Sequence, residues 1–417
     1  MEKPFHTIQK KCRLCFHKKL VPIFKLKPTP PAEWYFDGQN KYKTKDKFPL
    51  DIYMCNNCNH VQLVNVLDPD KLFTPYFYKS KTSPGLEAHF KSYASDVVSM
   101  FKLNNKSFVV DIGSNDGTLL KHFRNNGILK ILGVEPANKI AEEANNNGIP
   151  TLNKFMNKQA SNEIITKYGY ADLVTANNVF AHNDELGKML NSIYNILKGD
   201  GVFVFEVSNL HDTIKGKVFD FIYHEHLCYH SVKPLKNFFK LHNMEIFDVK
   251  RFPNKGGSLR VFAQKKSNNF NISKSVQEFI NFEVKEGLYE EKTYKNFVND
   301  IENLKSTNNN YLLNKLKQGK KIAGYGASAT VTTLLHYFDL GNIIDFIVDD
   351  NEIRHNTFSP GHHIPVYNTD QIYKSMPDII VILAWRFAND IIAKHQKFID
   401  KGGQFIVPLP EFKIIKN

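Results

Sequence analysis

The clearest pattern along the chain is an apolar run followed by a glycine-containing turn and an amphipathic segment. From Phe108 the sequence reads FVVDIGSNDGTLLKHF, which predicts a buried strand ending at Asp111, a tight turn and a helix with one apolar face. The next run, ILKILGVEP, predicts a second strand with Glu135 at its carboxyl end. This order is typical of the opening of a Rossmann-like unit.

Two further apolar runs continue this unit. The segment YADLVTANNVF predicts a strand that leads into a polar loop at Asn177 and Asn178, and DGVFVFEVSNL predicts a strand that ends near Glu206. In a doubly wound sheet the carboxyl ends of parallel strands meet at one edge, and ligands bind there. We therefore expect a binding site at the ends of these strands.

The last third of the chain repeats the pattern. Residues 265 to 318 have apolar positions spaced by three and four among many charges, which predicts helices. The segment KKIAGYGASATVTTLLHYF then predicts a strand, a turn at Gly324 and Gly326, and a helix. Three more strands are predicted in IIDFIVDDN, PDIIVILAWRF and GGQFIVPLPEF. We expect a second Rossmann-like layer here.

The composition is that of a globular protein. With 417 residues, 42% hydrophobic and 23% charged, the chain is long enough for two or three domains and apolar enough to bury their cores. The 55 Lys and Arg residues against 42 Asp and Glu give a net charge of +13, spread along the chain, which favours anionic ligands such as phosphate. No apolar run approaches the roughly 20 residues that cross a bilayer, so we expect a cytoplasmic protein.

Four cysteines form two closely spaced pairs, Cys12 with Cys15 and Cys55 with Cys58. Two C-x-x-C loops can complete the tetrahedral sulfur shell that Zn²⁺ prefers. Because sulfur would fill all four positions, no water could bind the metal, and we expect a structural zinc site. The intervening residues 16 to 54 are rich in proline and polar residues, which predicts a looped-out insertion.

The glycine turn indicates the cofactor. It reads D-x-G-x-x-x-G rather than the dinucleotide G-x-G-x-x-G, which favours a cofactor without a pyrophosphate, S-adenosylmethionine. An acid at the end of the next strand is placed to bind ribose hydroxyls. DIGSNDG followed by GVEP resembles the first two motifs of class I methyltransferases. The residues expected at the cofactor are Asp111, Gly113, Asn115, Gly117, Glu135, Asn177 and Asn178.

These patterns together predict an α/β protein of three domains. We expect a zinc-binding domain at residues 1–75 and a class I methyltransferase domain with a Rossmann-like sheet at residues 76–264. Residues 265–417 are expected to form the second Rossmann-like domain.

Titratable residues are concentrated in the segment KVFDFIYHEHLCYHSV. Eight consecutive positions hold Tyr223, His224, Glu225, His226, Tyr229 and His230. The H-E-x-x-H zinc template fails because residue 228 is Cys. On a helix, His226 and His230 would share a face and could bind metal, whereas a base at His226 oriented by Glu225 would suit proton transfer. A polar cluster at a domain interface is a further interpretation.

At these residues the chain resembles the sugar C-methyltransferases of deoxysugar pathways, which act on nucleotide-linked 4-keto sugars and build branched-chain sugars. The resemblance extends across the chain. It rests on the paired C-x-x-C start, Y-F-Y-K-S at 76 to 80, D-I-G-S-N-D-G-T, N-N-V-F-A-H, Y-H-E-H-L-C-Y-H-S, G-G-S-L-R at 256 to 260 and G-Y-G-A-S-A. Of these, Y-H-E-H and G-G-S-L-R are the specific ones.

The resemblance implies a catalytic site. In that family the Y-x-E-H residues line the reacting sugar and a histidine is the favoured base, which implies Tyr223, Glu225 and His226, with His182 and Tyr78 completing the site. A C–H bond beside a ketone becomes acidic only when the enolate oxygen is stabilised, so a base and an oxyanion donor must bracket the sugar. That step requires no metal or redox cofactor.

The resemblance also implies that the C-terminal domain helps to hold the nucleotide sugar. The implied contacts are Gly257, Ser258, Arg260, Gly324, Tyr325, Gly326, Ala327, Asp349 and Asn351. The chain departs from the family pattern at Lys255, where a His often precedes G-G-S-L-R, at Thr330 and Val331, where Lys-Gly is frequent, and at Arg386, where Asn is common. These departures concern the sugar and the nucleotide rather than the methyl-donor turn.

The leading hypothesis is an S-adenosylmethionine-dependent C-methyltransferase that acts on a nucleotide-diphosphate keto sugar, for a branched sugar of a surface polysaccharide or metabolite. One alternative moves the methyl group to a sugar oxygen or nitrogen. Another is a zinc-bearing nucleic-acid-binding protein, which would need a contiguous basic face. Residues 177 to 180 lack the Asn/Asp-Pro-Pro-aromatic signature of base methyltransferases. We therefore expect neither a nucleic acid nor a membrane as partner.

Overall fold

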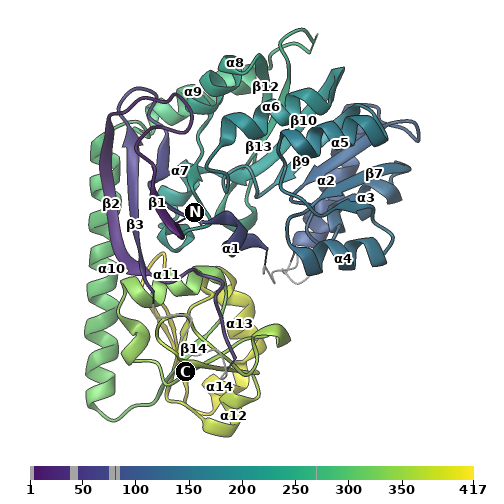
Figure 1. Cartoon of the computed structure of the whole chain (residues 1–417). Helices are drawn as coiled ribbons and strands as arrows, with labels where there is room; N and C mark the ends of the chain where they lie inside the picture. The colour runs from purple at the N-terminus through teal and green to yellow at the C-terminus, as the bar shows by residue number, and fades with distance from the viewer. Residues whose placement is uncertain (1–3, 38–45, 75–79, 81–84, 269) are drawn as a thin grey trace.

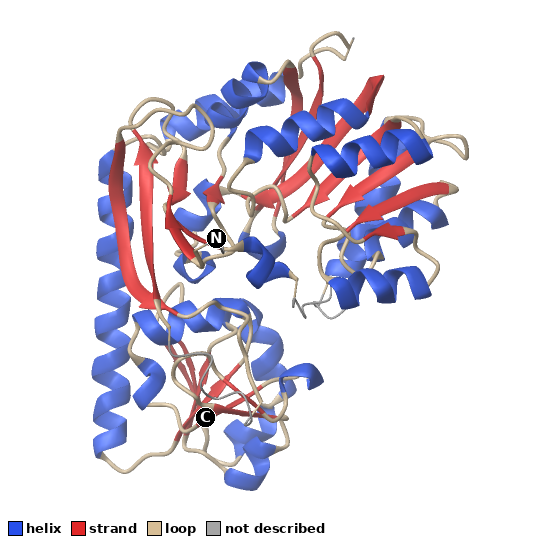
Figure 2. Ribbon diagram, in the orientation of Figure 1, coloured by secondary structure: helices blue, strands red, loops and turns tan. Residues whose placement is uncertain are grey.

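A computed structural model of the chain describes residues 4–37, 46–74, 80, 85–268 and 270–417. It contains a narrow antiparallel sheet, a central α/β domain and a C-terminal α/β domain, and the long helix α10 (Glu291–Lys317) runs along the first and the last of these (Figure 1). Strands and helices alternate in both α/β domains, as Figure 2 shows. None of the helices in these ranges is long and apolar enough to span a membrane.

The central sheet has seven strands in the order β12-β13-β10-β9-β6-β7-β8. The five strands from β8 to β10 are parallel, and β13 and β12 add an antiparallel hairpin at one edge. The strands are β6 (Phe108–Ile112), β7 (Lys130–Val134), β8 (Thr151–Leu152), β9 (Ala171–Asn177), β10 (Leu197–Ser208), β12 (Met244–Phe252) and β13 (Ser258–Lys265). The strands that the sequence predicts at 108, 130, 171 and 201 are all present.

Helices cover both faces of this sheet, which is why its central strands are apolar throughout. Successive residues of β6 face opposite sides: Val109 packs with the helices α2 and α3, and Val110 belongs to the core on the side of α5 and α6. The helices around the sheet are α2 (Leu86–Met100), α3 (Thr118–Asn125), α4 (Asn138–Asn146), α5 (Lys158–Tyr168), α6 (Leu186–Ile196) and α8 (Val232–Leu241).

The C-terminal domain has a second seven-stranded sheet, in the order β16-β17-β15-β14-β18-β19-β20. Its five inner strands are parallel and its two edge strands antiparallel. The sequence predicts β14 (Ile322–Tyr325), β15 (Phe346–Val348), β18 (Ile379–Ile382) and β19 (Gln404–Val407), but not the short β16 (Thr357–Phe358), β17 (Pro365–Tyr367) and β20 (Lys413–Ile415). Its helices are α11 (Ala329–Tyr337), α12 (Gln371–Ser375), α13 (Ala388–Lys394) and α14 (Gln396–Asp400), preceded by α9 (Lys274–Lys285) and α10.

The N-terminal sheet corrects one expectation. The residues between the cysteine pairs are not a simple looped-out insertion, because β2 (Leu20–Thr29) and β3 (Phe48–Cys55) pair as long antiparallel strands. Pro22 and Pro28 are tolerated because β2 is an edge strand, and the pairing shifts register between Pro22 and Phe24. The remaining elements are β4 (Val61–Leu63), β11 (Cys228–Tyr229), the pair β1 (His6–Ile8) and β5 (Asn65–Leu67), and α1 (Pro69–Phe73).

Side chains from all three regions meet around the segment that follows β10. The ring of Phe24 in β2 packs edge-on against Phe297 of α10 and Tyr337 of α11. The hydroxyl of Thr333 in α11 donates to the carbonyl oxygen of Ile222 at 2.8 Å. These contacts place residues 219 to 230 between the domains, where the sequence concentrates its histidines.

Candidate active site

One cavity of about 1650 Å³ lies where the three regions meet. Its wall includes Gly113 and Glu135 at the carboxyl end of the central sheet, His226 from the segment after β10, and Tyr325 and Asp349 from the C-terminal domain. Pockets for a single drug-sized ligand span about 300–1,000 Å³, so this cavity has room for two ligands side by side.

The donor end of the cavity is built from the glycine turn. Gly113 and Asn115 both have a left-handed backbone, with φ of 63° and 52°. A Cβ atom at Gly113 would lie 2.2 Å from Cγ2 of Val179, so no side chain fits there. The Glu135 carboxylate accepts hydrogen bonds from the backbone N–H groups of Asn115 and Ala137, both at 2.9 Å. These bonds fix the turn against the acid.

The structure brings five of the seven expected donor residues to the cavity wall, namely Gly113, Asn115, Glu135, Asn177 and Asn178. Asp111 lies behind the wall, where its carboxylate accepts the Thr175 hydroxyl at 2.6 Å. Burial raises the pKa of Asp111 to about 7. Gly117, with φ of 77°, precedes α3 and packs against Ile149. These two residues shape the turn rather than the cavity surface.

The donor end fits S-adenosylmethionine. The side chain of Asn177, whose polar atoms are buried, lies at this wall beside the Tyr93 hydroxyl and can bond a polar ligand group. The Glu135 carboxylate lies at this wall, where an acid could bind ribose hydroxyls, and Val134, Pro136 and Met156 supply apolar surface beside it.

The imidazole of His226 is held in its neutral form. Its Nδ1 atom lies 2.7 Å from the carbonyl oxygen of Phe221. A carbonyl can only accept, so Nδ1 must carry a proton, and in a neutral ring Nε2 then has the free lone pair. Burial and, to a smaller extent, the positive charge of Lys255 lower the pKa of His226 to about 4. The imidazole is therefore neutral at pH 7.

His182 and Tyr223 lie beside this ring. The ring centroid of His226 is 4.1 Å from that of Tyr223 and 5.0 Å from that of His182. The His182 ring stacks on Phe73 of α1, and burial holds its pKa well below the ordinary value. The backbone N–H of His182 donates to Val179, the residue that closes over Gly113. The histidines thus adjoin the donor end.

The other polar residues of the reactive segment take different places. Among residues 223 to 230 no helix forms, so His226 and His230 do not share the helix face that the metal interpretation of this pair requires. His230 is fully buried and stacks on His60. Glu225 is buried and does not line the cavity, and the hydrogen bond that orients His226 comes from Phe221. Tyr78 lies outside the described residues.

Three residues of the G-G-S-L-R motif, Gly257, Ser258 and Arg260, do not line the cavity. The Arg260 guanidinium is buried between the rings of Tyr93 and Phe252, 4.0 and 4.1 Å from their centroids. Its Nε atom lies 3.0 Å from the Glu206 carboxylate. Arg260 therefore ties β13 to β10 and α2, and this contact with the central core replaces the expected contact with the sugar.

The C-terminal wall contains most of the expected nucleotide-sugar residues, namely Tyr325, Gly326, Ala327, Asp349 and Asn351. Gly324 lies behind the wall, where a Cβ atom would be 2.7 Å from Leu383. The Asp349 carboxylate accepts the backbone N–H groups of Ala327 at 2.5 Å and Asn351 at 2.7 Å. The acid at the end of β15 thus shapes the turn before α11, as Glu135 does at the donor end.

Sequence reasoning missed the basic side chains of the wall. Lys255, Arg354, Arg386 and Lys394 all line the cavity, and in the sequence Lys255 and Arg386 stand out only as departures from a family pattern. Arg354 pairs with Glu33, and Lys394 pairs with Asp350. In a chain with so many lysines, a basic residue after a strand end is weak evidence for a binding site. Only the fold brings these four side chains to one cavity.

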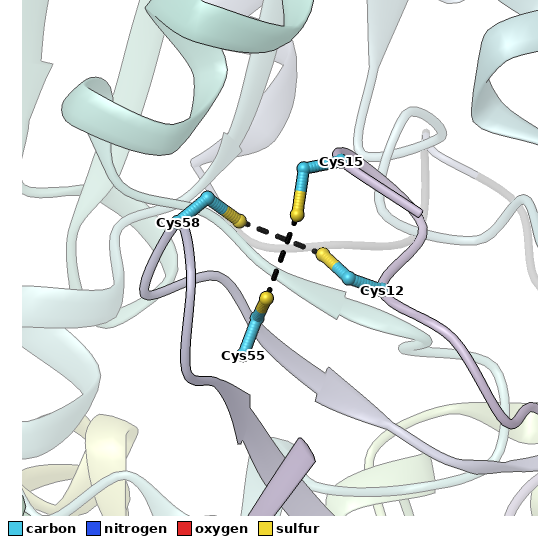
Figure 3. Close-up of side chains that lie close together, drawn as sticks. All are labelled: Cys12, Cys15, Cys55 and Cys58. Carbon is cyan, nitrogen blue, oxygen red and sulfur yellow. Dashed lines mark hydrogen bonds between the residues drawn. The ribbon is translucent and has the colours of Figure 1, made fainter. Parts of the chain in front are cut away.

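The four paired cysteines form a single cluster (Figure 3). Their Sγ atoms all lie within 4.8 Å of one another, and Cys12–Cys58 and Cys15–Cys55 are both 3.5 Å apart. Zn–S bonds of about 2.3 Å in a tetrahedron separate the sulfurs by about 3.8 Å, so the cluster fits Zn²⁺. The four thiolates would complete the metal shell, which is the arrangement of a structural site.

Comparisons with known proteins agree with this organisation. Three family models match consecutive parts of the chain: "Putative zinc binding domain" at residues 12–73, "Methyltransferase domain" at 86–249 and "C-methyltransferase C-terminal domain" at 253–410. The C-methyltransferase NovU of Streptomyces niveus is 32% identical over 405 residues, which cover 97% of this chain and 96% of that protein.

Solved structures show more distant likeness. Magnesium protoporphyrin IX methyltransferase from Synechocystis, with bound S-adenosylmethionine, is 14% identical over 43% of this chain and 79% of that chain, with a TM-score of 0.33. An S-adenosylmethionine-dependent methyltransferase from Clostridium acetobutylicum is also 14% identical, over 43% and 91% of the two chains, with a TM-score of 0.35.

The central domain and its donor site define a class I S-adenosylmethionine-dependent methyltransferase with a four-cysteine zinc-binding domain. The chain belongs to the C-methyltransferase family that includes NovU. The predicted family, the α/β fold class and the cofactors S-adenosylmethionine and zinc are thereby confirmed.

Proposed function

We propose that the protein transfers a methyl group from S-adenosylmethionine to a carbon next to the ketone of a nucleotide-linked 4-keto sugar, with His226 as the base. The single observation that carries this proposal is the order of groups along one cavity. The donor end, the pair of neutral histidines and the C-terminal wall with Arg386 follow one another in a space of about 1650 Å³. Two ligands bound from opposite ends would meet at the histidines.

The C-terminal end supports an anionic substrate. Lys255 and Arg386 belong to the wall, and Arg386 packs beside the Lys255 loop, because a Cβ atom at Gly256 would lie 3.7 Å from its Cδ. A nucleotide diphosphate carries negative charge that the Lys255 ammonium attracts. The Arg386 guanidinium, which already bonds Asp220 and Thr330, has further N–H donors for a phosphate oxygen. The sugar ring would then extend from the diphosphate toward His226.

The residues at the histidines support carbon as the methyl acceptor. Nε2 of His226 removes the proton from the carbon beside the ketone, and the electron pair of that C–H bond gives an enolate. Tyr223, whose ring lies next to that of His226, would donate a hydrogen bond to the enolate oxygen. Bound S-adenosylmethionine supplies an electrophilic methyl group whose bond to sulfur breaks with the electron pair left on sulfur. The enolate carbon forms the new C–C bond, the ketone is restored, and His226 releases its proton to solvent.

The test is incubation with S-adenosylmethionine and a panel of nucleotide 4-keto sugars in D₂O, followed by mass spectrometry. We expect a mass gain of one methylene on a sugar carbon. Without the donor, the proton at that carbon should exchange with solvent deuterium, and His226→Asn should abolish both signals. The control is His17→Asn, since His17 is exposed and absent from the cavity wall. Methylation on oxygen or nitrogen, or exchange that persists in His226→Asn, would refute the proposal.

A further inference from the structure

Arg13 lies inside the first C-x-x-C loop, yet its side chain leaves the cysteine cluster and enters the protein interior. The guanidinium is completely buried. Its Nη1 atom donates to the carbonyl oxygens of Leu63 at 2.6 Å and Leu227 at 3.3 Å, and its Nε atom donates to the Asp184 carboxylate at 2.9 Å. One cation thus contacts three separate segments.

Two of these segments carry the histidines of the cavity. Leu227 directly follows His226, and Asp184 lies two residues after His182. The segments are also joined to each other, because the carbonyl oxygen of Ala181 accepts the backbone N–H groups of Leu227 at 3.0 Å and Cys228 at 3.1 Å. Arg13 therefore contacts both of the segments whose hydrogen bonds to each other set the distance between the rings of His182 and His226.

The cysteine loops fix Arg13 in turn. Its backbone N–H donates to the Gln62 side chain at 2.9 Å, and the same side chain donates to the carbonyl oxygen of Lys11 at 3.0 Å. Gln62 lies in β4 opposite Cys228 of β11, so the cysteine loop and the histidine segment share one strand pair. When the four-cysteine site is ordered, it holds the backbone of Arg13 in a fixed position.

We propose that Arg13 is a positioning residue for the methyl transfer, which links the four-cysteine site to the segments of His182 and His226. The inference rests on the proposed function of these histidines. The buried cation neutralises Asp184 and satisfies two carbonyl groups, which a lysine at the same position would not do, because an ammonium lacks the planar fork of donors. The zinc domain would then support catalysis without its metal touching the substrate.

The test compares full-length Arg13→Lys with Arg124→Lys, the same substitution at an exposed arginine. We expect Arg13→Lys to keep one zinc ion per chain and its affinity for S-adenosylhomocysteine, while kcat falls about 100-fold, as misplaced catalytic groups produce. Amide hydrogen exchange at Leu227 and Cys228 should become faster, since their bonds to Ala181 would open more often. Arg124→Lys should change none of these quantities.

Unchanged exchange at these two amides, whatever the effect on kcat, would overturn the proposal. If Arg13→Lys does not fold, Asp184→Asn tests the other end of the ion pair by the same exchange measurement. Because amide exchange is read without substrate, this result is independent of the proposed function. Full activity in His226→Asn would reject the proposed base and leave the link from Arg13 to residues 227 and 228 intact.

Discussion

Arg386 and Asp220 form an ion pair between the C-terminal domain and the segment that leads to Tyr223 and His226. Nη1 of Arg386 lies 3.0 and 2.9 Å from the two carboxylate oxygens of Asp220, whose side chain is fully buried. The indole N–H of Trp385 donates to the same carboxylate at 3.0 Å. Residues 384–387 (A-W-R-F), which follow β18, thus bind residues 218–221 (V-F-D-F). Arg386 also lines the cavity.

The first prediction concerns this pair. Arg386→Met should destabilise the protein by about 3–5 kcal/mol, because it leaves the buried Asp220 charge without a cation. Adding Asp220→Asn should recover much of the loss, which urea denaturation of the three variants would measure. Lys394→Met is the matched control, since Lys394 and Asp350 are both half-exposed and their pair should contribute no more than about 1 kcal/mol. Equal effects of Arg386→Met and Lys394→Met would contradict the assignment.

The second prediction concerns the pH dependence of the reaction. His226 must be neutral to accept a proton, so kcat should fall only as the pH drops through its pKa, which burial lowers to about 4. Activity should therefore persist well below pH 6.5, where a free imidazole would be protonated. Since the charge of Lys255 also lowers this pKa, Lys255→Met should move the acidic limb of the kcat profile to higher pH.

The control for this experiment is Lys250→Met, because Lys250 is exposed on the same hairpin and is absent from the cavity wall. It should leave the profile unchanged. An acidic limb near pH 6.5 in the unmodified protein would show that His226 is not the buried base described above.

The third prediction concerns the donor end. Glu135 uses both carboxylate oxygens to accept backbone N–H groups, and an amide in Glu135→Gln would present its own N–H₂ to one of these donors. The dissociation constant for S-adenosylhomocysteine should rise about 10- to 100-fold, as the loss of a buried hydrogen bond to a charged group implies. Calorimetry would measure this, with Glu142→Gln as the control at an exposed acid of α4. Unchanged affinity would remove Glu135 from the donor site.

The fourth prediction concerns the metal. Cys15→Ser should abolish stoichiometric zinc binding and unfold the N-terminal region, because the free energy of binding a structural metal is part of the free energy of folding. Cys228→Ser should retain one zinc ion per chain, since Cys228 lies outside the four-cysteine cluster. Metal analysis would measure the zinc content of the two variants, and far-UV circular dichroism would measure their folded structure. Zinc retained at full occupancy in Cys15→Ser would show that the four thiolates do not form the site.

Several features of this protein follow from the sequence alone. The apolar run before Asp111, the glycine turn and the acid at Glu135 are local in the chain, and a strand–turn–helix unit forms wherever they occur together. The same holds for the two C-x-x-C loops, because each loop already directs both of its sulfurs to one point. The family, the fold class and the two cofactors could therefore be predicted before any coordinates.

Only the tertiary structure decided which residues face the cavity. Arg260 and Tyr325 both belong to motifs of the same family, yet Arg260 is buried between two rings while Tyr325 lines the wall. Periodicity shows that a residue is near a strand end, but the choice between core and cavity depends on which distant element packs over it. The neutral state of His226 likewise depends on the Phe221 carbonyl and on burial beside His182 and Tyr223, and no local sequence pattern predicts these contacts.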